Sequence, residues 1–96
     1  MFIVLLTYTA PLEQIDRLGP AHRDWLRGCY DDGIFLASGP QDPRVGGAIL
    51  AHGLDREELE ARLALDPFAQ AGAATYHITK VSVKFSDPRL AFLVDG

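Results

Sequence analysis

The sequence has very little cysteine, since Cys29 is the only one among its 96 residues. A single cysteine excludes an intrachain disulfide and is typical of a reducing compartment, so we expect a cytoplasmic protein. Histidine is also scarce, and the three His residues and one Cys show no metal-ligand spacing. We therefore expect no metal site.

The chain also lacks an excess of positive charge. Nine Lys and Arg stand against 13 Asp and Glu, which gives a net charge of −4 and a pI of about 5.1. Nucleic acid is therefore not an expected partner. The apolar N-terminal stretch is too short for a membrane span and has the wrong flanks for a signal peptide. Neither a Walker motif nor a dinucleotide fingerprint is present, and we expect no cofactor.

The length and composition are those of one globular domain. The residues are 48% hydrophobic and 23% charged, and 96 residues suffice for one core. We predict a single domain over residues 1–96. Residues 86–96 form its C-terminal tail, and the apolar segment 90–94 in this tail is expected to add an edge strand or contact a partner subunit.

The order of predicted elements is β-α-β-β-α-β. Strands are expected at 2–9, 34–38, 47–52 and 75–85, and the second and third pair as a hairpin. A helix starts at Leu12, is broken or bent at Gly19-Pro20, and ends at Asp32-Gly33 with Gly33 as a left-handed cap. A second helix follows the N-cap Asp55, with Leu59, Leu63 and Leu65 in the core. This order predicts a ferredoxin-like α+β fold, a four-stranded antiparallel sheet with helices on one face.

The first strand is apolar on both faces. Phe2 and Val4 lie on one face, while Ile3 and Leu5 lie on the other. A sheet with one face in water would alternate more cleanly between apolar and polar residues. We therefore expect a second subunit to cover the outer face, giving a homodimer of the dimeric α+β barrel type.

His22 is the first candidate for chemistry. It lies on the apolar face of the first helix with Trp25, Leu26, Cys29 and Tyr30, while Arg23, Asp24, Arg27 and Asp31 point away. One interpretation is a neutral core histidine. The other is a general acid or base, because imidazole titrates near neutral pH.

Asp66 and Ser38 are the other candidates. Asp66 precedes Pro67, which is typical of a helix N-cap, and its carboxylate could also orient His22. Ser38 precedes Gly39-Pro40, so it is either a strand-ending hydroxyl or a hydrogen-bonding group for a ligand. It is not placed in a nucleophile elbow, and we do not predict a nucleophile.

The remaining candidates have simpler interpretations. Cys29 has no basic neighbour on its own helix face, so we interpret it as a small core residue. His52 and His77 end or occupy strands, and we interpret both as structural or exposed.

Taken in order, these features resemble the YciI-like (YCII-related) family. The features are His22, then Asp32-Gly33, Ser38-Gly39-Pro40, a glycine-containing loop, an acidic helix, and Asp66-Pro67-Phe68 before Gly72. The resemblance extends from Phe2 to about Phe85. It implies a ferredoxin-like fold that dimerises through its sheets, and a His/Asp centre carried here by His22 and Asp66. The tail after residue 85 departs from the simplest members.

The resemblance also implies a choice of functions. Some members are lyases or dehydrochlorinases of hydroxylated aromatic rings, so we expect a cofactor-independent lyase or isomerase. In it, His22 would transfer a proton, Asp66 would orient His22 and stabilise its imidazolium, and Ser38 would bind the substrate. Two alternatives stay open. One is a non-catalytic dimeric module that binds a small molecule, and the other is a cofactor-free monooxygenase or a muconolactone-isomerase-like enzyme.

Overall fold

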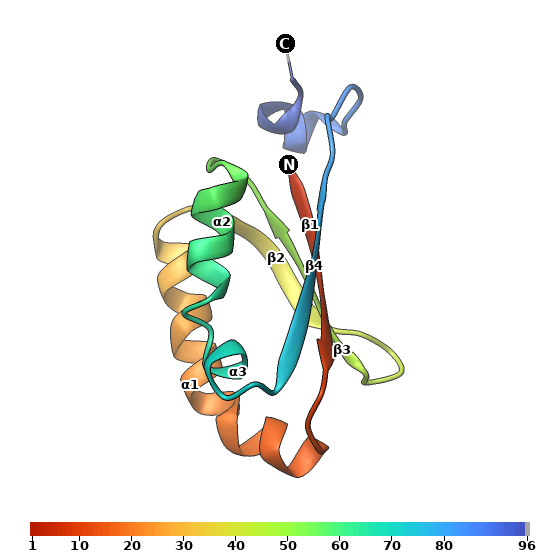
Figure 1. Ribbon diagram of the computed structural model, residues 1–96. Coiled ribbons are helices and arrows are strands. Elements are labelled where there is room, and N and C mark those ends of the chain that lie inside the picture. The colour runs from red at the N-terminus through yellow and green to blue at the C-terminus, as the bar shows by residue number, and fades with distance from the viewer. Residues whose placement is uncertain (96) are drawn as a thin grey trace.

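The computed structural model describes residues 1–95 and confirms the predicted fold class (Figure 1). Gly96, the last residue of the predicted tail, lies outside the described residues. The elements are β1 (Phe2–Tyr8), α1 (Leu12–Asp31), β2 (Phe35–Pro40), β3 (Gly46–Ala51), α2 (Arg56–Leu63), α3 (Pro67–Gln70), β4 (Ala74–Lys80) and the 3-10 helix η1 (Pro88–Leu93). The strands form one antiparallel sheet in the order β2-β3-β1-β4, and the three α-helices cover one face of it.

The core lies between that face and the helices. Side chains of β1 alternate across the sheet, so that Phe2, Val4 and Leu6 are buried while Leu5 is 42% exposed on the open face. The rest of the core is apolar and comes from every layer: Ile15, Cys29, Phe35, Ile49, Ala51, Leu59, Leu63, Phe68 and Ala73. The outer face of the sheet is therefore uncovered in the single chain.

Helix α1 runs through Gly19-Pro20 without ending. Proline lacks an N–H and disfavours the preceding turn, which explains the bend early in the helix (Figure 1). The helix ends as predicted, with Gly33 in the left-handed region at a φ of 72°. Cys29 is fully buried, and this burial raises the pKa of its thiol, as expected for a core residue.

Two strand ends differ from the prediction by two residues or more, and the others agree to within one residue. Strand β2 continues to Pro40, because an edge strand has one side on which the missing N–H of proline is not needed. Strand β4 ends at Lys80 and not at Phe85, which is 95% exposed. The reason is its partner: Lys80 pairs with Phe2, so β1 has almost no residues left to extend the ladder.

The tail is not an edge strand, so that alternative was wrong. Residues 88–93 form η1, and one bridge joins Val83 to Val94. Leu93 is buried, while Phe92 is 58% exposed. Figure 1 shows the tail beyond the end of the sheet, on the side of the N-terminus. Contact with a partner subunit stays a prediction.

Helices α2 and α3 begin with the predicted caps. Asp55 and Glu58 form a complete capping box, and the Asp66 carboxylate accepts a hydrogen bond from the N–H of Phe68. Leu65 was wrongly placed in the core: α2 ends at Leu63, and Leu65 is 57% exposed. No helix within residues 1–95 is long and apolar enough to cross a membrane.

Gly46 has no space for a side chain, which gives a test of the fold. A Cβ at Gly46 would lie 1.7 Å from the carbonyl oxygen of Leu6, a backbone atom held in the β1 ladder. We expect Gly46→Ala to lower the free energy of unfolding by about 3 kcal/mol or more, measured by urea denaturation. Gly39→Ala on β2 is the control, because a Cβ there meets nothing within 4 Å. Equal effects of the two substitutions would contradict the close approach.

Candidate functional site

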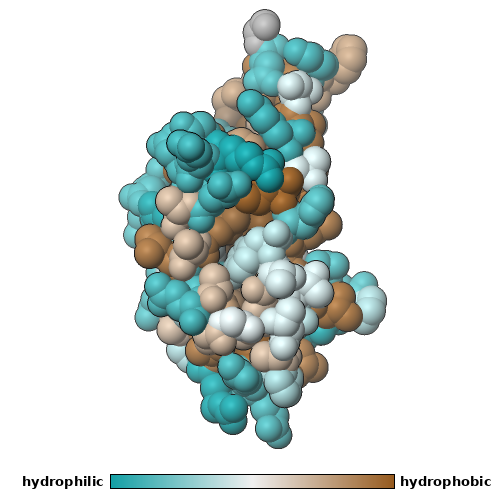
Figure 2. Space-filling view, in the orientation of Figure 1, coloured by the Kyte–Doolittle hydropathy of each residue, from teal (hydrophilic) through white to brown (hydrophobic). Residues whose placement is uncertain are grey.

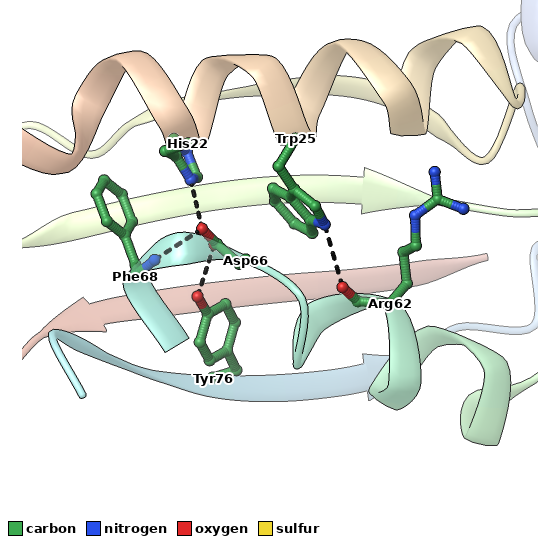
Figure 3. A network of polar contacts seen from close by, with 6 residues as sticks. All are labelled: His22, Trp25, Arg62, Asp66, Phe68 and Tyr76. Atoms are coloured by element: carbon green, nitrogen blue, oxygen red, sulfur yellow. Dashed lines mark hydrogen bonds and ion pairs between the residues drawn. The ribbon is translucent and has the colours of Figure 1, made fainter. Parts of the chain in front are cut away.

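The structure brings His22 and Asp66 together although 44 residues separate them in the sequence (Figure 3). His22 lies on α1 and Asp66 is the N-cap of α3, and the distance from Nδ1 to the Asp66 Oδ1 is 2.7 Å. The His22 side chain is 16% exposed and that of Asp66 is fully buried. The contact that a dyad requires is thus present, while its use in catalysis stays a prediction.

The carboxylate of Asp66 accepts three hydrogen bonds. Its Oδ1 accepts from the Phe68 N–H at 3.0 Å and from His22, and its Oδ2 accepts from the Tyr76 hydroxyl at 2.6 Å. A buried carboxylate needs this many partners to remain ionised at low cost. The interpretation of Asp66 as a helix cap is confirmed, and the same atom that caps α3 also contacts the imidazole.

These contacts assign the tautomer of His22. Asp66 is an acceptor, so the Nδ1 of His22 carries the hydrogen and Nε2 has the free lone pair when the ring is neutral. Within residues 1–95, every buried side-chain nitrogen has a hydrogen-bond partner, whereas Nε2 of His22 has none. Nε2 is therefore accessible from outside the protein.

Aromatic side chains hold the ring of His22 in place. The Phe68 ring stacks on the imidazole, with the ring centres 4.0 Å apart and the planes 12° apart. The ring of Trp25 packs beside the imidazole, with the ring centres 5.6 Å apart. Its Nε1 donates a hydrogen bond to the Arg62 carbonyl oxygen at 3.2 Å (Figure 3). Stacking and the bond to Asp66 together fix both the plane and the rotation of the imidazole.

His22 lines a cavity of about 230 Å³ between α1 and the β2–β3 hairpin. Ser38 lines the same cavity, and its Oγ lies 2.7 Å from the Tyr30 hydroxyl. The other lining residues are mostly small or apolar: Leu6, Leu26, Gly39, Pro40, Gly47, Ala48, Ile49 and Phe68. An apolar cavity with a few polar groups is what a small organic ligand requires.

Arg23 also lines this cavity. It is exposed, as expected for a residue outside the apolar face of α1, and it lies at the border of the cavity. Its guanidinium lies against Gly19, one turn earlier on α1.

The other histidines lie apart from the cavity. His77 is exposed on the outer face of β4, and the His52 ring contacts that of Phe92 in the tail at 5.2 Å. Within residues 1–95, no three His, Cys, Asp or Glu side chains come close enough together to hold a metal ion.

Comparison with family models identifies the domain. The model described as the YCII-related domain matches residues 1–82, which include His22, Ser38 and Asp66. The chain belongs to the YCII-related family. The family resemblance of the sequence is confirmed, and the tail after Ser82 lies outside the matched part. A comparison with curated proteins found no match.

A solved structure shares the fold of this YCII-related chain. It is 5-chloro-2-hydroxyhydroquinone dehydrochlorinase from Burkholderia phenoliruptrix AC1100, in complex with 2,5-dihydroxybenzoquinone. The TM-score is 0.69 and the sequence identity 17%, over 84% of this chain and 93% of that chain. At 17% identity, this similarity shows a shared fold and nothing more.

Tyr76 is the member of the polar network that the sequence analysis missed in this YCII-related domain. It pairs with Leu6 on β1 and therefore faces the helices, where its hydroxyl needs a partner. A tyrosine on the inward face of a strand was the available signal. Burial and, next, the hydrogen bond with Asp66 raise the pKa of Tyr76 above its ordinary value of 10.0.

This raised pKa predicts an alkaline titration. The unfolded chain releases the Tyr76 proton above about pH 10, but the folded chain keeps it. The stability that Tyr76 contributes is therefore present below that pH and is lost as the pH rises further. Below pH 10, we expect Tyr76→Phe to cost about 1–3 kcal/mol, because Oδ2 of Asp66 loses its donor.

The measurement is the ultraviolet absorbance of tyrosinate, compared between the wild type and Tyr76→Phe. While both proteins are folded, the two absorbance changes should be equal, because Tyr76 does not ionise. The wild type should gain the extra absorbance only when it unfolds. An extra tyrosinate in the folded wild type would contradict the assignment.

Proposed function

We propose that this protein is a small enzyme that uses His22 as a proton-transfer group and needs no cofactor. The observation that carries the proposal is the 2.7 Å contact from the His22 Nδ1 to Asp66, which leaves the Nε2 lone pair accessible on a residue that lines a mostly apolar cavity. A base of this kind works at neutral pH if its imidazolium is stabilised, and the buried carboxylate supplies that charge. Ser38 would hold a polar group of the substrate.

The reaction class we propose is an elimination on a small hydroxylated aromatic compound. The substrate reacts as its keto tautomer, in which the ring carbon that bears the leaving group is tetrahedral. Nε2 takes a proton from a ring hydroxyl, the electron pair of the broken O–H bond forms a C=O bond, and the ring double bond shifts toward the carbon that bears the leaving group. The leaving group departs with its bonding pair as an anion, such as chloride. The proton and the anion account for the HX that is lost, so the step needs neither an oxidant nor a reductant.

Two findings support this choice. The cavity of about 230 Å³ is smaller than the sites that bind drug-sized ligands, so it suits a compound of about one ring. The solved structure with the same fold is named as a dehydrochlorinase of a chlorinated hydroxyhydroquinone. An isomerisation would use the same base, since Nε2 would then return the proton to another atom of the substrate.

The test is a panel of chlorinated hydroxylated aromatic compounds, including 5-chloro-2-hydroxyhydroquinone, with released chloride as the readout. For a substrate that is turned over, we expect His22→Gln to lower kcat/KM at least about 100-fold. His52→Gln is the matched control, because His52 lies apart from the cavity. An unchanged rate in His22→Gln would refute the base. Binding without turnover of any compound would favour the non-catalytic module.

We also propose that two chains form a homodimer through the outer face of the sheet. This face presents aliphatic side chains at paired positions of two neighbouring central strands. Ile3 pairs with Leu50 and Leu5 with Ala48. Leu5 is 42% exposed in the single chain, and a second copy would bury this apolar surface.

A charge in the centre of that face should prevent association. We expect the wild type to be a dimer and Leu5→Lys to be a folded monomer, measured by light scattering after size-exclusion chromatography. Leu65→Lys is the control, because Leu65 is 57% exposed in the α2–α3 connection. A monomeric wild type, or a dimer that survives Leu5→Lys, would exclude this interface.

A further inference from the structure

We propose that Arg23 forms an anion subsite in the His22 cavity, and that the substrate carries an anionic oxygen. This inference rests on the proposed function and names its substrate class. The ligand would be a small ring compound with a carboxylate or an ionised ring hydroxyl. Its anionic oxygen would pair with Arg23 while the reacting proton meets the Nε2 of His22.

The position of Arg23 is the first argument. It directly follows His22 on α1, and both residues line the same cavity as Ser38. Among the lining residues Arg23 carries the only permanent charge, and no Asp or Glu lines the cavity. Arg23 is an exposed residue at the edge of this mostly apolar cavity, so its charge can attract an anionic group of a ligand although water screens it in part.

Gly19 provides the space for the guanidinium. A Cβ at Gly19 would lie 3.1 Å from the Nη1 of Arg23 and 3.8 Å from its Cζ, so the guanidinium rests over the backbone of Gly19. The absence of a side chain at Gly19 leaves room for Arg23 to fold back along α1.

The guanidinium of Arg23 is also not used by the protein itself. The arginines that pair with a carboxylate are Arg27, Arg44, Arg56, Arg62 and Arg89. Within residues 1–95, no Asp or Glu oxygen lies within 4.0 Å of Arg23. Although the chain carries a net charge of −4, no carboxylate within residues 1–95 pairs with Arg23, so its N–H donors stay available to a ligand. The planar fork of a guanidinium matches a carboxylate with two parallel hydrogen bonds.

The same charge suits the proposed chemistry. Removal of a proton from a hydroxylated ring increases the negative charge on the ring oxygens. A guanidinium beside His22 would stabilise that charge as it forms, without having to move.

Benzoate and benzamide are matched probes for this subsite, since they differ in charge and hardly in shape. Binding is followed by titration in two-dimensional NMR, with the amide signals of the cavity residues as reporters. We expect Arg23→Gln to weaken benzoate binding about 10-fold to 100-fold, as for the loss of a hydrogen bond to a charged group. Benzamide binding should be unchanged.

Arg17→Gln is the control, because Arg17 lies on the same helix, has no carboxylate partner within residues 1–95 and does not line the cavity. It removes the same charge and should leave benzoate binding unchanged.

Three results would overturn the subsite. One is equal weakening of benzoate binding by Arg17→Gln and Arg23→Gln, which would mean that only the overall charge of the protein matters. The others are equal binding of benzoate and benzamide, and a cavity that millimolar benzoate does not perturb. These binding readouts do not depend on turnover, so the two proposals can fail separately. If benzoate binding requires Arg23 but His22→Gln leaves the rate unchanged, the subsite stands and the base is refuted. If His22→Gln lowers the rate but benzoate binding does not require Arg23, the base stands and the subsite is refuted.

Discussion

The buried carboxylate of Asp66 is the interaction on which the arrangement of this domain depends. It is fully buried and accepts from His22 on α1, from the Phe68 N–H of α3 and from the Tyr76 hydroxyl of β4. An ionised carboxylate without partners costs several kcal/mol in a protein interior. The three elements therefore have to meet at this point, and the fold and the site are stabilised by the same hydrogen bonds.

This sharing has a consequence for the chemistry. A base that changes its charge during a reaction needs surroundings that do not rearrange. The Asp66 carboxylate cannot turn away from His22 without losing the cap of α3, because Oδ1 accepts both hydrogen bonds. Phe68 acts in two ways: its backbone N–H completes the cap, and its ring stacks on one face of the imidazole. Orientation of His22 is thus a property of the folded core and needs no bound ligand.

The sequence predicted more of the fold than of the site, for physical reasons. The strand alternation and the caps at Asp55 and Asp66 depend on local spacing, so they could be read directly. The pairing of His22 with Asp66 was one of two open interpretations from the residues, and the family resemblance favoured it, since helix periodicity gives a face but no partner. Tyr76 was missed because strand register decides what an inward tyrosine meets. The place of Arg23 at the edge of the cavity was missed because helix periodicity does not give the path of a long side chain. The predicted end of the last strand at residue 85 was wrong for a similar reason, because the length of β4 depends on its partner β1.

The residues around the cavity also divide into two groups with different constraints. His22 and Phe68 come from the packed helices and are tied to Asp66, so a change in either disturbs the core. Ser38, Gly39 and Pro40 come from an exposed edge strand that pairs only with β3. Side chains at such positions are replaced at little cost in stability. The hairpin can therefore determine which substrate fits, while the helices keep the proton-transfer group fixed.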